Sequence, residues 1–343
     1  MGYIKLKKFQ MILQQAVSNG WSDIHLTMNE NLYYRKKNNL YINNNFNILE
    51  KDVREIIENI LNEKQLQQLN NNKVVDCAYE LFSHRYRINI YSVYKGYSIA
   101  VRLINEKIIP LKEFYQQETL KNILKNNSGM VLICGATGTG KSTTLASMID
   151  FINRQQAKHI ITLEEPIEYV FNSDKSLIHQ REYQVDFYDF SNAIKMAMRQ
   201  DPDIIMVGEI RDQETMKACL NAGETGHLVL GTLHASSVIE AILRMGSFFY
   251  TEQLISINVQ IANTLNSIIV QKLVPTLENN LSCCMEILIN NSAIKNLISN
   301  NQLAQIKSQM QLNKQQGMQF IKDDIFKLYK MKKISNDIMN LYV

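Results

Sequence analysis

The chain has 343 residues, of which 45% are hydrophobic and 20% are charged, and its formal net charge is +4. This length allows two domains with separate cores. So small a net charge does not by itself imply nucleic-acid binding, and no direct contact with nucleic acid is expected. The five cysteines include no Cys-x-x-Cys pair, which argues against a zinc site or a disulfide framework and fits a reducing compartment. The sequence has neither the apolar segment of a signal peptide nor the roughly 18 apolar residues of a transmembrane segment. We therefore expect a soluble, cytoplasmic protein that reaches a membrane only through partners.

The first part of the chain, residues 1–105, is predicted to be a small α+β domain with an antiparallel sheet. Apolar residues recur at helical spacing over two segments, Leu6–Val17 and Val53–Leu69. Strand-like runs are Ile24–Met28, Leu32–Arg35, Tyr86–Tyr94 and Tyr97–Leu103.

An extended linker is predicted over residues 106–112, because the residue before Pro110 avoids the α region. Residues 113–343 then alternate helices and strands, beginning with a helix near Glu118–Lys125. Strands are predicted at Val131–Cys134, His159–Leu163, Ile204–Val207 and Leu228–Thr232. This alternation predicts an α/β fold with a mostly parallel sheet and helices on both faces. From about Thr251 onward the pattern predicts mainly helices.

The strongest motif follows the apolar run Val131–Cys134, where Gly-Ala-Thr-Gly-Thr-Gly-Lys-Ser has the form of a phosphate-binding loop. Its glycines let backbone N–H groups turn toward anionic oxygens, and a helix expected over Ser142–Arg154 adds its positive end. We expect Lys141 to reach the β- and γ-phosphates of a nucleotide and the Ser142 hydroxyl to ligate Mg²⁺. The predicted nucleotide contacts are Gly135, Ala136, Thr137, Gly138, Thr139, Gly140, Lys141, Ser142 and Thr143.

Three further predicted strands end in residues that can take part in phosphate chemistry. One strand runs into Glu164 and Glu165, and a carboxylate there can polarise an attacking water. Another runs into Glu209, the place where P-loop ATPases hold an acid beside Mg²⁺ and its waters. His234 follows a strand expected beside the phosphate-loop strand, so it is a candidate sensor of the γ-phosphate, although a lone histidine is more often structural.

Together these motifs resemble the secretion-superfamily hexameric ATPases, most closely the type IV pilus retraction ATPases of the PilT/PilU kind. The matching segments are Ser22–Leu26 (start of a PAS-like N-terminal domain), Gly135–Thr143 (Walker A), Glu164–Glu168 (Asp box), Gly208–Asp212 (Walker B), Ala222–His227 with Thr232–His234 (His box) and Ser292–Ile298 (a C-terminal retraction motif). The resemblance implies a RecA-like P-loop ATPase core over residues 113–343 with C-terminal helices, and a PAS-like α+β domain over residues 1–105.

The resemblance also implies roles for individual residues. Glu164 becomes the general base that orients water, Glu209 the acid near Mg²⁺, in part through water, and His227 and His234 the nucleotide sensors. Arginines that reach a nucleotide across a subunit interface are implied as well. These are Arg85, Arg87 and Arg102 in the first domain, and Arg181 and Arg199 in the second.

The implied function is ATP hydrolysis that powers pilus retraction by a hexameric ring. Its implied partners are an inner-membrane pilus platform protein and a paralogous retraction ATPase. Two alternatives stay open: a pilus-assembly, type II secretion or DNA-uptake ATPase of the same superfamily, or a weakly active accessory paralogue. Glu165 stands for the usual Asp of the Asp box, and Lys295 stands for the usual Arg of the C-terminal motif, which removes a planar guanidinium.

Overall fold

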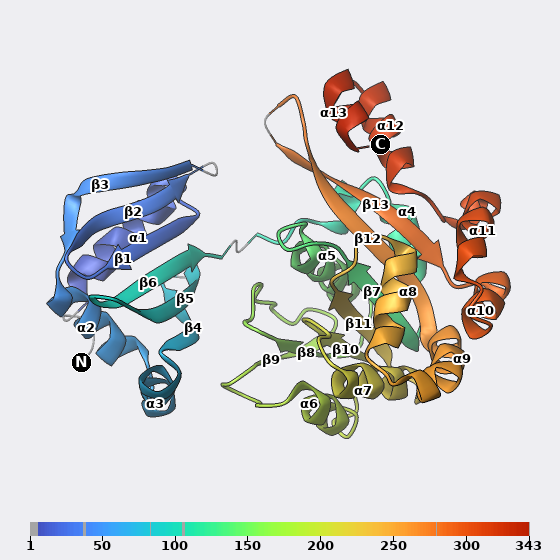
Figure 1. Cartoon of the computed structure of the whole chain (residues 1–343), viewed down its shortest axis with the longest axis horizontal. Coiled ribbons are helices and arrows are strands. Elements are labelled where there is room, and N and C mark those ends of the chain that lie inside the picture. Colours follow the sequence, from blue (N-terminus) through green and yellow to red (C-terminus); the bar gives the residue numbers. More distant parts are fainter. Residues whose placement is uncertain (1–5, 37–38, 83, 105–106, 279, 343) are drawn as a thin grey trace. The chain divides into compact units, whose positions relative to one another are not determined.

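A computed structural model describes residues 6–36, 39–82, 84–104, 107–278 and 280–342 (Figure 1). The chain divides into two compact units, residues 1–107 and 108–343, and each has its own hydrophobic core. In the part of the chain that the structure describes, no helix combines the length and apolar character needed to cross a bilayer.

The first unit is built on a six-stranded antiparallel sheet with the order β3-β2-β1-β6-β5-β4. Its strands are β1 (Asp23–Thr27), β2 (Glu30–Lys36), β3 (Asn39–Ile48), β4 (Val74–Leu81), β5 (His84–Val93) and β6 (Gly96–Leu103). Its helices are α1 (Lys7–Asn19), α2 (Glu50–Ile60) and α3 (Glu63–Asn72). Alternate strand residues such as Ile24, Ile88 and Val101 share one core with Ile12 of α1 and Val53 of α2. One face of the sheet is therefore apolar, and the intervening residues lie on the other face.

The single helix predicted over Val53–Leu69 is wrong, because two helices occupy this segment. Leu61 has an extended backbone and ends α2. The Asn62 side chain then accepts a hydrogen bond from the Gln65 N–H (2.9 Å), and the Gln65 side chain accepts one from the Asn62 N–H (3.0 Å). This reciprocal capping box starts a new helix. Strands β3 and β4 are missing from the prediction, and the run Asn43–Asn45 in β3 has little strand propensity.

The second unit contains a seven-stranded sheet with the order β13-β12-β7-β11-β10-β8-β9 (Figure 1). Its strands are β7 (Gly129–Cys134), β8 (His159–Glu164), β9 (Leu177–Glu182), β10 (Ile204–Val207), β11 (Leu228–Leu233), β12 (Leu265–Pro275) and β13 (Leu281–Ile289). Neighbouring strands are parallel except for β12 and β13, which are antiparallel. The predicted parallel sheet is confirmed.

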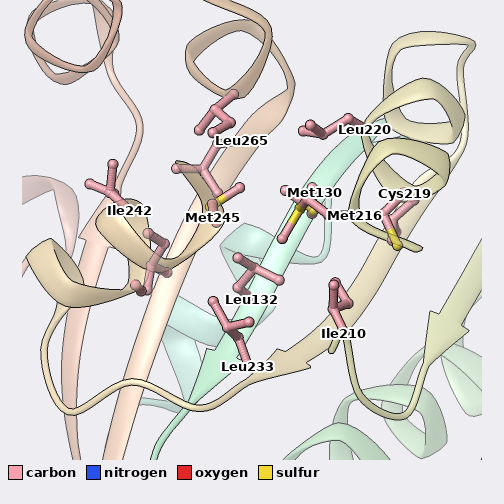
Figure 2. Packing of buried hydrophobic residues seen from close by; sticks show 14 of the residues in the cluster. Met130, Leu132, Ile210, Met216, Cys219, Leu220, Leu233, Ile242, Met245 and Leu265 are labelled. Atoms are coloured by element: carbon pink, nitrogen blue, oxygen red, sulfur yellow. The ribbon is translucent and has the colours of Figure 1, made fainter. Parts of the chain in front are cut away.

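Helices cover both faces of this sheet, as predicted. They are α4 (Gln117–Ile123), α5 (Lys141–Gln155), α6 (Phe190–Ala197), α7 (Gln213–Glu224), α8 (Val238–Ser247), α9 (Leu254–Thr264), α10 (Ser292–Ser299), α11 (Ile306–Leu312), α12 (Ile321–Lys330) and α13 (Asn336–Tyr342). Leu132 of β7 packs in one core with Met216 of α7 and Met245 of α8 (Figure 2). Its neighbour Val131 belongs to a second core with Leu145 of α5. Successive residues of β7 thus face opposite layers, and the strand is buried on both sides.

The prediction of mainly helical structure after Thr251 is wrong for residues 265–289, which form β12 and β13. The apolar run Ile268–Val270 is fully buried between β7 and β13. In so short a run of consecutive apolar residues, the spacing of apolar positions does not distinguish a strand from a helix. Its partner strand β7 lies far away in the sequence, so only the tertiary pairing settles its conformation.

Candidate nucleotide-binding site

The loop between β7 and α5 forms an open cradle. Gly138 and Gly140 have φ angles of +79° and +84°, which L side chains rarely adopt, and nothing lies within 4 Å of the place where a Cβ of Gly138 would stand. The Lys141 ammonium donates to the carbonyls of Gly135 (2.9 Å) and Ala136 (3.0 Å), so it lies over the loop. Burial lowers the pKa of Lys141, and the nearby Glu209 carboxylate opposes this shift. An open glycine-rich turn with a fixed cation at a helix start fits a phosphate group.

Strand β12 supports this loop from one side. The Gln271 side-chain amide donates to the Thr139 carbonyl at 2.6 Å, and the Gln271 residue is only 1% exposed. A Cβ on Gly135 would stand 2.8 Å from the Gln271 carbonyl oxygen, so only glycine fits there. Gln271 was not predicted as part of the site, because its segment was expected to be helical.

A cavity of about 380 Å³ lies beside the loop. The loop and α5 contribute Thr139, Gly140, Thr143 and Thr144, the strands contribute Gln271, Leu273, Leu281, Ser282 and Cys283, and the segment before α4 contributes Ile109, Glu113, Phe114 and Tyr115. This volume and the mixture of aromatic, apolar and hydroxyl side chains suit a nucleobase and its ribose.

Glu164 is the last residue of β8, and it is only 5% exposed. Its Oε1 atom accepts hydrogen bonds from the Thr162 hydroxyl (2.6 Å) and from the Gln180 amide (3.1 Å). Burial raises the pKa of Glu164 to about 7, although both hydrogen bonds favour the charged form. A carboxyl group with such a pKa can accept a proton from water near neutral pH.

Glu209, which follows β10, has charged neighbours instead. Arg211 binds the Glu209 carboxylate through Nη2 (2.7 Å) and the Glu165 carboxylate through Nη1 (2.6 Å). His234 Nε2 lies 3.1 Å from Glu209 Oε1. Burial acts to raise the pKa of Glu209, but the hydrogen bond and charge of Arg211, with His234 and Lys141 nearby, hold it below its usual value. Glu209 therefore stays ionised at neutral pH, as an acid that holds Mg²⁺ through oxygen ligands must.

The sheet brings four of the predicted residues to one edge. Strands β7, β11, β10 and β8 are parallel neighbours, so their carboxyl ends meet there. Lys141, His234, Glu209 and Glu164 each follow or end one of these strands. Arg211 joins them through Glu209 and Glu165; it lies in the Gly208–Asp212 motif, but no role was predicted for it.

Three other predicted residues do not meet the loop of the same copy. His227 precedes β11, and its carbonyl accepts from the Gly129 N–H, so a six-residue strand of roughly 20 Å separates it from the loop. Arg199 precedes β10 and lies toward the same far edge. Arg181 is on the edge strand β9, where its Nη2 donates to the Asp186 carbonyl (3.0 Å).

The remaining predicted arginines belong to the first unit. Arg87 of β5 and Arg102 of β6 are directly opposite cross-strand partners. Arg85 lies two residues before Arg87 and so on the same face of β5. An aspartate accompanies each member of the pair: Asp23 lies 2.7 Å from Arg102 Nε, and Asp76 lies 3.5 Å from Arg87 Nε.

A phosphate cradle at the end of a buried strand, with carboxylates on the neighbouring parallel strands, defines a P-loop nucleotide-binding protein with a RecA-like core. Residues 3–324 match the family described as Type II/IV secretion system protein, and the chain belongs to that family. It is 36% identical over 309 residues to the type IV pilus retraction ATPase PilT of Pseudomonas aeruginosa, covering 90% of both chains. It is 39% identical over 271 residues to a twitching motility protein of Neisseria gonorrhoeae, covering 78% of this chain and 72% of that protein.

Among solved structures, the pilus retraction motor PilT with bound ADP matches with a TM-score of 0.89 at 36% identity. The match covers 97% of this chain and 96% of that chain. The predicted fold class and the resemblance to retraction ATPases are confirmed.

Replacing Gln271 by leucine should weaken nucleotide binding about threefold to tenfold, because the Thr139 carbonyl loses its buried donor and the loop loses its support. Titration with a fluorescent ATP analogue measures this. The matched control is Gln260→Leu on α9, since the Gln260 amide donates to Asn221 and Glu224 of α7. Equal affinities for the Gln271→Leu and control proteins would show that β12 does not support the loop.

Proposed function

We propose that this protein hydrolyses ATP and uses the energy to retract a type IV pilus, as a hexameric ring motor. The observation that carries the proposal is the pair of carboxylates at the strand ends. Glu164 has a pKa near neutrality, whereas Glu209 is held ionised. Pairs of groups whose environments separate their pKa values are typical of acid–base catalysis. The retraction ATPase and the twitching motility protein among the relatives support pilus retraction as the process that ATP hydrolysis drives.

In this proposal ATP is the substrate and the β7–α5 loop holds its phosphates through backbone N–H groups. Lys141 neutralises the β- and γ-phosphates, and Ser142 and Glu209 hold Mg²⁺, in part through water. When bound, Mg²⁺ neutralises charge that develops on the phosphate oxygens. Glu164 orients the attacking water and accepts its proton, and His234, beside Glu209, responds to the presence of the γ-phosphate.

The arginines of the first unit complete the proposed site from a neighbouring copy. An arginine at a transferring phosphoryl group stabilises the developing charge and is worth about 10³–10⁵ in rate. Arg85, Arg87 and Arg102 would supply this charge, and Arg181, Arg199 and His227 would act at the same interface between copies. This assignment needs an oligomer, and the ring of the retraction ATPases is the proposed form.

The proposed partners are an inner-membrane pilus platform protein and a paralogous retraction ATPase. The motor would then work at the cytoplasmic side of the inner membrane through these partners. An accessory ring paralogue with little turnover is the second candidate. It is favoured by Lys295, which lacks the planar fork of the usual arginine.

The central test is Glu164→Gln in the purified full-length protein. The amide cannot accept the proton of water, so the ATPase rate should fall about 10²- to 10⁴-fold while ATP binding persists. A phosphate-release assay and an ATP-analogue titration measure the two quantities. The control Glu118→Gln removes an exposed carboxylate of α4 that pairs with Lys121. A wild-type protein that forms rings but shows only background turnover would exclude the motor and favour the accessory role.

The pKa of Glu164 makes a second prediction. The base must be ionised, so the rate should fall as the pH drops below about 7. Thr162→Val removes a hydrogen bond that favours the charged form, which raises the pKa further and moves the acid limb toward higher pH by about half to one pH unit. Thr264→Val is the control, since its hydroxyl donates to the Gln260 carbonyl in α9. A limb that stays in place in the Thr162→Val protein would contradict Glu164 as the base.

Mixed rings test whether the arginines act between copies. Arg102→Ala and Lys141→Ala proteins should each be nearly inactive. In equal mixtures with subunit exchange, about a quarter of the interfaces in a head-to-tail ring would combine an intact loop with an intact arginine. The ATPase rate of the mixture should therefore exceed that of either variant alone. Failure to recover at every ratio, with mixed rings detected by mass, would count against the shared site.

A further inference from the structure

Two arginines stand side by side on the sheet of the first unit. Arg87 and Arg102 are direct partners on β5 and β6, and the Arg102 side chain is 66% exposed. Like charges directly opposite one another destabilise an antiparallel pair. Such a pair therefore needs compensating negative charge, either from the fold or from a bound anion.

The fold supplies negative charge on both outer sides of the pair. Asp23 is the partner of Arg102 on β1, and its Oδ1 atom accepts from Arg102 Nε at 2.7 Å. The other oxygen of Asp23 accepts from the Ser22 hydroxyl at 2.8 Å, and the Asp23 side chain is only 14% exposed. On β4, Asp76 Oδ1 lies 3.5 Å from Arg87 Nε. The order across the sheet is thus aspartate, arginine, arginine, aspartate.

The hydrogen bond from Arg102 Nε to Asp23 has a geometric consequence, whereas Asp76 is an ion-pair neighbour of Arg87 at 3.5 Å. A guanidinium is planar and carries five N–H donors, so fixing its Nε–H fixes the plane of the group. The Nη edge then remains for a second anion, and this edge binds phosphate in the bidentate manner. The Asp23 carboxylate is largely buried and accepts two hydrogen bonds. Its position is therefore better fixed than that of the exposed Arg102 side chain that it binds.

We propose that Asp23 and Asp76 are positioning residues, which hold Arg102 and Arg87 side by side so that both Nη edges meet one triphosphate. This inference rests on the proposed function, in which that triphosphate is bound by a neighbouring copy. It gives the Ser22–Leu26 motif a chemical task. An arginine held in place loses less conformational freedom when it meets its anion than a mobile one does.

The alternative role for Asp23 is structural, as a counter-charge that lets two arginines share a sheet. The two roles differ in what they predict. A purely structural role predicts a lower melting temperature for Asp23→Ala, because the two facing arginines lose a largely buried counter-charge, with an unchanged rate of the folded protein. A positioning residue should instead lower the rate, and only when the arginine that it positions is present.

The experiment is a double-mutant cycle in the full-length protein, measured by single-turnover ATP hydrolysis with excess enzyme so that slow variants remain measurable. Asp23→Ala should lower the rate about 10- to 100-fold, the cost of a misplaced catalytic group, with little change in ATP affinity. Asp23→Asn, which keeps an acceptor oxygen, should lose less. In the Arg102→Ala background, Asp23→Ala should cause no further loss. Asp76 and Arg87 form a second cycle of the same design.

Each outcome has one meaning. An Asp23→Ala protein as fast as the wild type, beside an impaired Arg102→Ala protein, would overturn the positioning role alone. Equal losses from Asp23→Ala with and without Arg102 would also overturn it, because the aspartate would then act elsewhere. An unimpaired Arg102→Ala protein would contradict the arginine's part in the proposed function itself. Glu50→Gln is the matched control, since it removes an ion pair with Arg54 on α2 of the same unit.

Discussion

The parallel alignment around β7 is the constraint on which the rest of the second unit depends. This strand lies between β11 and β12 and is buried on both faces, so its direction and register are fixed by two cores at once. Because β10 and β8 run the same way, every catalytic candidate that follows a strand arrives at the edge where the phosphate loop opens. A single reversed strand would move its terminal residue to the opposite edge, where His227 lies.

The pKa of each carboxyl group at that edge is set by its neighbouring side chains and not by its residue type. Glu164 and Glu209 are both glutamates at strand ends. Glu164 is buried with the neutral donors Thr162 and Gln180, so a proton is retained to about pH 7. Glu209 is paired with Arg211, which outweighs its burial and keeps it charged. The two glutamates at this edge therefore differ in pKa although they are the same residue type, and the residue type alone does not predict the difference.

Local signals explain which parts of the fold were predictable. The glycine-rich loop and the strands β8, β10 and β11 combine short apolar runs with punctuating polar residues, and all were predicted. The strands β12 and β13 were not, since their apolar runs carry no helix–strand distinction without their partners. The roles of Gln271 and Arg211 in the site were not predicted, for a related reason. Their importance lies in contacts with Thr139 and Glu165, which are remote in sequence and only become neighbours through the sheet. The Arg102–Asp23 contact likewise depends on strand register, which residue spacing does not disclose.

The arginine pair bears on how turnover and assembly are coupled. Arg87 and Arg102 lie opposite each other in the sheet, so their charges repel. The two flanking aspartates offset this repulsion only from the outer sides. An anion between the arginines would remove the remaining repulsion, so a bound phosphate would stabilise the pair most strongly. If that phosphate belongs to a nucleotide on another copy, the same charges that speed hydrolysis also hold the ring together. Nucleotide binding and contact between copies then strengthen each other by the same free energy, as linkage requires. Under the proposed function, hydrolysis would weaken that contact at one interface, and a ring of identical chains would then convert a local change of charge into motion.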